Sequence, residues 1–159
     1  MTTLGTLLDD FMFRSASETD RDRKFEDLVR EFLTADTRWS AEFDQVWAWD
    51  QWPEGDGEKT AVDLVAHQQD TDGLIAVRCV FHDPDSPLPK EDVEGFLSAS
   101  DKAPFTGRLV VATTDDWDSD ADAAIADQAV PVRKISLTDL LSSSVDWTAF
   151  EPDTLVSTN

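Results

Sequence analysis

The chain has 159 residues and a formal net charge of −21, from 34 acidic and 13 basic side chains. This length suits one domain with its own core, and the lack of a long apolar tract argues against a membrane-spanning helix. The acidity disfavours non-specific binding to a DNA backbone, because such binding depends on positive side chains. We therefore expect a soluble, cytoplasmic protein in which the single cysteine, Cys79, forms no internal disulfide.

The first third of the chain is predicted to be mainly helical. Apolar residues recur at helical spacing within residues 4–13, which predicts a short amphipathic helix. Residues 15–23 are polar and predict a loop, followed by a helix from Asp20 or Asp22 to Leu33 with a continuous apolar stripe.

Three strands are expected in the middle of the chain. After a brief helix at residues 36–43, the segment Phe43–Trp49 alternates as a strand does. Two further runs, Thr60–His67 and Leu74–Phe81, are rich in apolar and β-branched residues. Asp72 and Gly73 between these runs are typical of a tight turn, so we expect a hairpin.

Asp63 is the residue in this hairpin that requires explanation. A carboxylate within an apolar strand is costly to bury unless it has a partner or a metal ion. Because side chains alternate along a strand, Ala76, Arg78 and Val80 should share one face of the second strand. The hairpin could therefore place Arg78 opposite Asp63.

The remaining segments alternate between helix and strand. We expect a helix from Pro89 to Ser100, a central strand at Arg108–Thr113 and an edge strand at Val130–Ile135. Ser119, with Asp122 three residues later, resembles a helix-capping box. Ser136 should cap a last short helix, after which Trp147 should fold back on the domain.

Residues Thr60–Ala66 and Ala76–Phe81 resemble the Mrr-like branch of the PD-(D/E)XK nucleases. They are most similar to the domain at the N-terminus of type ISP restriction-modification enzymes and of helicase-fused relatives. The resemblance extends over Phe43–Pro53, Lys90–Ser100 and Arg108–Trp117 and into residues 131–147. It implies an α/β fold, with a restriction-endonuclease-like αβββαβ core and a mixed central sheet flanked by helices. The implied domain is residues 20–150, between a leading helix and loop at 1–19 and a flexible tail at 151–159.

The resemblance implies a catalytic pattern that this chain departs from. The family has an acid, then Gln or Glu, one spacer and Lys, which bind Mg²⁺ or Mn²⁺ and orient water. Here the acid is Asp63, but the next two positions hold Arg78 and Val80. Arginine stays positively charged in proteins, and valine cannot orient water. We expect Arg78 to pair with Asp63 in place of a metal ion, so that no cofactor is needed.

Three other charged residues are weighed as site residues. Glu26 matches an acid that the family carries on its first core helix, although it could instead be a surface acid paired with Arg30. Lys59 lies near Asp63 in the sequence and could replace the missing lysine. Lys90 is kept from the family pattern and could contact DNA in active relatives, or it could simply be exposed.

Three functions remain open from the sequence. The first is a catalytically degenerate domain linked to restriction, defence or counter-defence, with a restriction-modification or helicase protein as partner and little DNA binding of its own. The second is an active, Mg-dependent endonuclease that uses Asp63 and Glu26, with Lys59 or Lys90 as base. The third is an acidic DNA mimic. The acidity also fits a salt-rich cytoplasm or a surface that merely favours solubility.

Overall fold

A computed structural model describes residues 4–53, 62–83, 85–101, 105–143, 145 and 147. The helices are α1 (Leu4–Arg14), α2 (Glu18–Ala35), α3 (Thr37–Ser40), the 3-10 turn η1 (Trp49–Gln51), α4 (Glu91–Ser100), α5 (Ser119–Ala126) and α6 (Leu137–Leu141). The strands are β1 (Phe43–Ala48), β2 (Leu64–Gln68), β3 (Leu74–Val80), β4 (Phe105–Ala112) and β5 (Val132–Ile135). None of the described helices combines the length and the apolar character needed to cross a bilayer.

The five strands form one mixed sheet in the order β1-β2-β3-β4-β5. The pairs β1–β2 and β2–β3 are antiparallel, whereas β3–β4 and β4–β5 are parallel. Helix α4 connects β3 to β4, and α5 connects β4 to β5, so the sheet contains two crossover connections. The predicted αβββαβ order and the edge position of β5 are confirmed.

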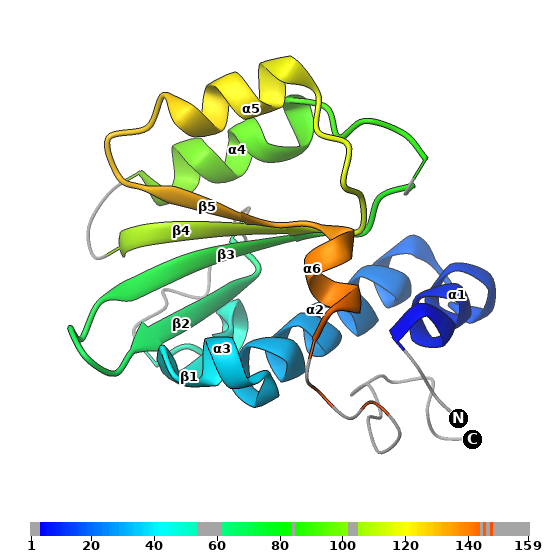
Figure 1. Ribbon diagram of the computed structural model, residues 1–159, viewed down its shortest axis with the longest axis horizontal. Helices are drawn as coiled ribbons and strands as arrows, with labels where there is room; N and C mark the ends of the chain where they lie inside the picture. The colour runs from blue at the N-terminus through cyan, green and yellow to red at the C-terminus, as the bar shows by residue number, and fades with distance from the viewer. Residues whose placement is uncertain are drawn as a thin grey trace.

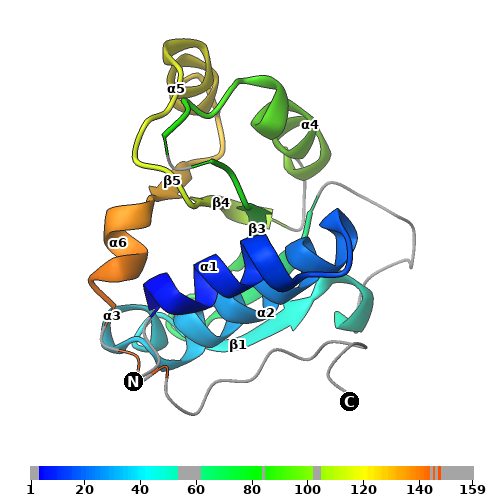
Figure 2. The same ribbon diagram turned by 90° about the vertical axis from the view of Figure 1, so that its right-hand side faces the viewer.

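Helices cover both faces of the sheet (Figure 1). Helices α1, α2 and α3 lie on one face, and α4 and α5 lie on the other, as the turned view in Figure 2 also shows. Each face has its own apolar core, and the strand β3 contributes to both: Val77 and Cys79 to the first and Ala76 and Val80 to the second. The predicted alternation of β3 is therefore confirmed.

Two predicted element boundaries, at α2 and at β2, differ from the structure. Only residues 15–17 of the predicted loop at 15–23 lie between helices, because α2 begins at Glu18 and Ser17 caps it by accepting a hydrogen bond from the Asp20 N–H. Acidic residues are favourable in the first turn of a helix, so the polar composition that predicted a loop here marks the start of α2 instead. The predicted start of the next strand, at Thr60, lies outside the described residues; of those described, Asp63 directly precedes β2, which begins at Leu64, and does not lie within it as predicted.

Of the two helix caps predicted for α5 and α6, one is wrong and one is confirmed. The N-cap of α5 is Asp118, whose side chain accepts from the Asp120 N–H, so the capping box predicted at Ser119 is wrong. Ser136 does form a capping box with Asp139 at the start of α6, as predicted. Trp147 is buried in the first core, which confirms the prediction for this residue.

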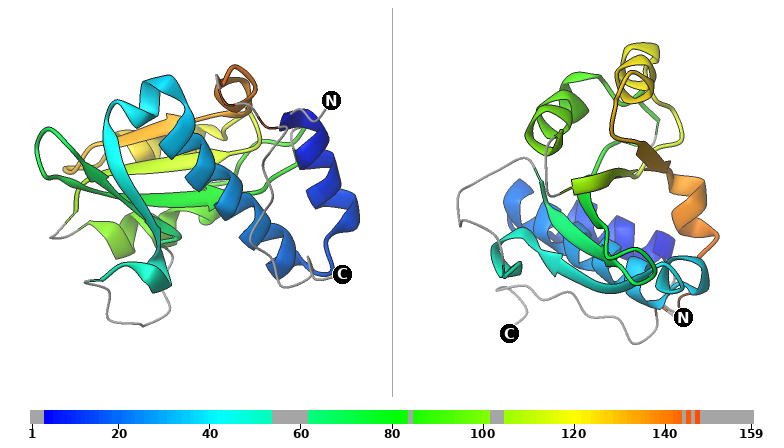
Figure 3. Two further views of the ribbon diagram at one scale, coloured as in Figure 1. Left: turned by 90° about the horizontal axis from the view of Figure 1, so that it is seen from below. Right: turned by 90° about the vertical axis from the view of Figure 1, so that its left-hand side faces the viewer.

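Arg108 on β4 is a buried charged residue that joins several elements on the α4–α5 side. Its side chain is 1% exposed. It donates to the Leu97 carbonyl at 2.8 Å, the Val130 carbonyl at 3.0 Å and Gln128 Oε1 at 2.7 Å. These bonds fix the end of α4 and the approach to β5 against the sheet. Figure 3 shows the sheet from two further sides.

Candidate functional site

The backbone at Asp63 connects the start of β2 with β3 and with the residue that follows β1. The Asp63 N–H donates to the Val77 carbonyl at 2.9 Å, and the Asp63 carbonyl accepts from the Trp49 N–H at 3.0 Å. Leu64 is the first β2 residue opposite β3, where it faces Val77. Asp63 therefore lies where the β2–β3 ladder ends, close to the end of β1, and its side chain can reach groups that the ladder leaves unpaired.

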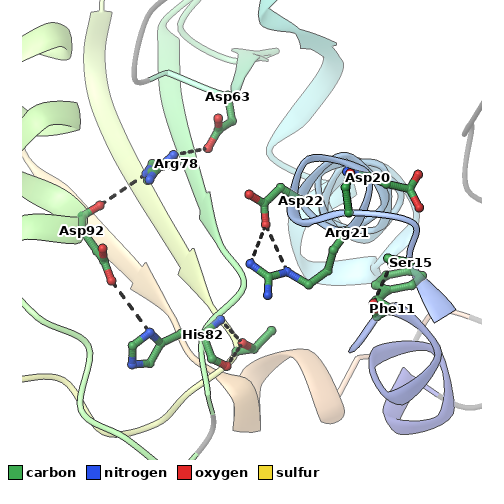
Figure 4. Close-up of polar contacts among 11 residues, drawn as sticks. Phe11, Ser15, Asp20, Arg21, Asp22, Asp63, Arg78, His82 and Asp92 are labelled. Carbon is green, nitrogen blue, oxygen red and sulfur yellow. Dashed lines mark hydrogen bonds and ion pairs between the residues drawn. The ribbon is translucent and has the colours of Figure 1, made fainter. Parts of the chain in front are cut away.

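The Asp63 carboxylate forms the predicted ion pair with Arg78 (Figure 4). Arg78 Nη1 lies 3.2 Å from Asp63 Oδ2, and the same oxygen accepts a 2.8 Å hydrogen bond from the Cys79 N–H. Arg78 Nε also donates to the Asp92 carbonyl on α4, at 3.3 Å. The side chain of Asp63 is 14% exposed and that of Arg78 is 29% exposed. The guanidinium thus connects Asp63 to α4 in a site partly shielded from water.

Val80 follows two residues after Arg78 on the same strand face. Its side chain is 8% exposed and belongs to the core beneath α4 and α5. Ala112 of β4 lies opposite it in the parallel register. The position where the resemblance implies a lysine therefore carries an apolar group that packs in the core.

Glu26 projects from α2 into the neighbourhood of Asp63. Burial raises the pKa of Glu26 to about 8, and the negative charge of Asp63 raises it as well. A carboxyl group with this pKa mostly keeps its proton at neutral pH. Arg30, the alternative partner, instead donates to the Val46 carbonyl at 3.0 Å and to Gln51 at 3.3 Å.

Burial also dominates the protonation of two neighbouring groups. The pKa of Asp63 is raised by burial, although Arg78 and the Cys79 N–H act in the opposite direction. Burial raises the pKa of the Cys79 thiol well above its usual range, and the charges of Asp63 and Glu26 add to that effect. Cys79 is a free, buried cysteine, so it serves here as a core residue.

The two lysines considered from the sequence have different outcomes. Lys59 lies outside the described residues. Lys90 is exposed and directly precedes α4, where its carbonyl accepts hydrogen bonds from the Val93 and Glu94 N–H groups. Within the described part of the chain, no ion pair joins Lys90 to Asp63.

Asp92 is the site residue that the sequence did not reveal. Its carbonyl accepts from Arg78, and its carboxylate lies 3.8 Å from His82 Nδ1 (Figure 4). The backbone N–H of His82 in turn donates to Thr113 Oγ1 at 2.7 Å. An acid in the first turn of a helix is ordinarily explained by the helix dipole, so no local pattern indicated this role.

Two solved structures with a similar fold indicate the class of protein to which this chain belongs. At a TM-score of 0.76 and 26% identity, the chain is similar to the structure titled "ATP-dependent Type ISP restriction-modification enzyme LlaBIII bound to DNA", with 95% of this chain and 9% of that chain covered. The structure titled "MspJI Restriction Endonuclease in Complex with 27-mer Oligonucleotide" shares the fold, at a TM-score of 0.55 and 19% identity, with 87% and 29% covered. The fold is therefore restriction-endonuclease-like, and the chain spans under a third of either neighbour.

The sequence family follows from a second comparison. A family model of Mrr type, described as "Restriction endonuclease", matches residues 34–156. The chain therefore belongs to this restriction endonuclease family. A search of curated proteins gave no significant match.

Proposed function

We propose that this chain is a catalytically degenerate nuclease-fold domain linked to restriction, defence or counter-defence, which binds protein or nucleic acid rather than cleaving DNA. The observation that carries this proposal is the ion pair between Arg78 and Asp63, with its 3.2 Å separation. In this pair, the permanently charged guanidinium of Arg78 takes the position at which the family resemblance implies a metal ion in active relatives.

The other side chains around Asp63 support the same proposal. Mg²⁺ requires near-octahedral oxygen ligands at about 2.0–2.1 Å and binds ionised carboxylates. Glu26, with its pKa raised to about 8, mostly holds a proton at neutral pH. Asp63 Oδ2 already accepts from Arg78 and the Cys79 N–H. Because Val80 offers no polar atom, these residues do not suit a resident Mg²⁺ or Mn²⁺.

An active nuclease is the second candidate, and the closeness of Glu26 to Asp63 favours it. Burial is the main cause of the raised pKa of Glu26, and the charge of Asp63 raises it further, as a neighbouring carboxylate does in a metal site before a metal binds. Cleavage would require Arg78 to move away and Lys59 or Lys90 to act as base. The third candidate, a DNA mimic, is supported by the net charge of −21.

The proposed partner is a restriction-modification or helicase protein in the cytoplasm. Both structural neighbours are restriction enzymes, one bound to DNA and the other in complex with an oligonucleotide, and this chain corresponds to 9% and 29% of their chains. A small domain with this resemblance and a net charge of −21 is suited to assembly with a larger protein that supplies the grip on DNA.

Plasmid cleavage tests the proposal directly. The purified chain is incubated with supercoiled plasmid and Mg²⁺ or Mn²⁺, beside an Asp63→Ala variant and a control with excess chelator. We expect no nicking or linear product above the chelator control. Metal-dependent cleavage that disappears in the Asp63→Ala variant would overturn the proposal in favour of the active nuclease.

A further inference from the structure

Exposed large apolar side chains gather at one place on the described surface. They are Met12, Phe13 and Leu141, which are 43%, 81% and 54% exposed. All three line one groove of about 370 Å³. Scattered apolar residues are normal on a protein surface, but apolar residues that converge on a groove are typical of a binding site.

This groove lies between α1 and α6, and we call it the α1–α6 groove. The two helices contact each other, with Met12 and Phe13 on α1 and Leu141 on α6. Figure 2 shows both helices on the same side of the molecule. Phe81, just after β3, lines the groove too, and it packs edge-on against Phe25 of α2 at a ring-centroid distance of 5.7 Å. The groove is therefore anchored in the first core.

Helix amphipathicity does not account for the apolar residues at the end of α1. The buried face of α1 consists of Leu4, Leu7 and Phe11, which satisfy the packing of the helix against the domain. Met12 and Phe13 lie off this stripe and are exposed. A helix that only packs against its own domain carries polar residues at such exposed positions. The apolar character of Met12 and Phe13 therefore favours contact with a binding partner.

The rim of the α1–α6 groove is acidic. Three exposed acids, Asp9, Asp83 and Asp85, line it together with the apolar groups, and the described lining contains no Lys or Arg. A second copy of this chain would bring a net charge of −21 toward this rim, and nucleic acid would bring phosphates. Both are repelled, so the complementary occupant is positively charged and partly apolar.

We propose that the α1–α6 groove binds a segment of a partner protein, an amphipathic helix whose apolar residues are flanked by Lys and Arg. This inference rests on the proposed function and extends it, because it names the chemistry of the partner. The apolar residues of that helix cover Met12, Phe13 and Leu141, and its basic residues pair with the acidic rim.

A designed peptide tests the groove without knowledge of the natural partner. The probe is an 18-residue helical peptide with Leu on one face and Lys on the other, and the matched probe has Glu in place of Lys. Binding to the full chain is measured by fluorescence anisotropy. The double variant Phe13→Gln, Leu141→Gln should bind the Lys peptide at least about tenfold more weakly, as expected when central apolar contacts are lost. Both side chains are more than half exposed, so the variant should fold.

A pair of charge variants separates groove binding from general attraction to an acidic protein. Asp85→Asn removes one of the three acidic charges of the rim, and Asp120→Asn removes one charge from an exposed position on α5, away from the groove. We expect a larger loss of affinity from Asp85→Asn. Equal effects of the two charge variants, unchanged binding by the double Gln variant, equal binding of the Glu peptide or no binding of the Lys peptide would each overturn the inference.

Two further measurements complete the test. Sedimentation velocity that shows a dimer abolished by the double Gln variant would assign the groove to a second copy and overturn the inference. Plasmid cleavage is independent of the groove, so a chain that cleaves DNA but binds the peptide as expected refutes the proposed function alone.

Discussion

Replacing Arg78 with alanine should destabilise the domain, because Asp63 would lose its charged partner while remaining 14% exposed. Breaking a fully buried pair from one side costs about 3–5 kcal/mol. Arg78 is 29% exposed, and Asp63 would keep its hydrogen bond from the Cys79 N–H, so we reduce this to about 1–3 kcal/mol. For a chain of this size, the loss corresponds to a fall in Tm of roughly 3–9 °C.

Circular dichroism during heating and urea titration measures this loss, and a double-mutant cycle isolates the pair. The variants are Arg78→Ala, Asp63→Asn and their combination, with Arg14→Ala as the matched control. Arg14 is 79% exposed and lies 3.7 Å from Asp10, so its removal should change stability by less than about 0.5 kcal/mol. An unchanged Tm for Arg78→Ala, or additive effects of the two site variants, would refute the proposed interaction.

Three further predictions concern the site and one helix end. Because the pKa of Glu26 rises from 4.5 to about 8 on folding, its stabilising proton is fully held below pH 4.5 and lost as the pH rises through 8. Glu26→Gln should therefore be more stable than wild type by roughly 1–3 kcal/mol at pH 9 and should flatten the pH dependence of urea unfolding; an unchanged pH dependence would contradict this. Arg78→Gln combined with Val80→Lys should give Mn²⁺ binding by calorimetry that exceeds any in wild type, and equal heats would count against the metal-replacement argument. Asp118→Ala should cost about 1 kcal/mol in urea unfolding, whereas Ser119→Ala should cost little, and the reverse order would move the cap of α5 to Ser119.

The order of elements was predictable because apolar periodicity is a local signal. Alternation in β3 and the apolar stripe of α2 were read correctly from single segments. The start of α2 was missed because charged residues in a first helical turn look like a loop in composition. The cap of α5 was misplaced by one residue because Asp118 and Ser119 are both good capping residues, and the backbone dihedral angles decide between them.

The candidate site was predictable only where strand geometry dictates it. Asp63 directly precedes β2 and Arg78 lies on the neighbouring strand β3, so their pairing followed from hairpin register and opposite charge. The contact of Arg78 with the Asp92 carbonyl depends on how α4 packs on the sheet, which no local pattern encodes. The raised pKa of Glu26 likewise depends on burial, which the sequence does not specify for a residue beside an apolar stripe.

The net charge and the ion pair bear on different parts of the proposed function. If the acidity is an adaptation to a salt-rich cytoplasm, screening to about 3 Å at 1 M salt weakens the surface field, and DNA binding is no longer opposed by it. Salt screens an ion pair that is partly shielded from water far less than it screens exposed charges, so Arg78 would still pair with Asp63 at high salt. Salt could therefore restore contact with DNA without restoring cleavage. Cleavage that appears only at molar salt would show that salt breaks the Arg78–Asp63 pair as well as screening the surface charges. The ion pair would then no longer support a degenerate site.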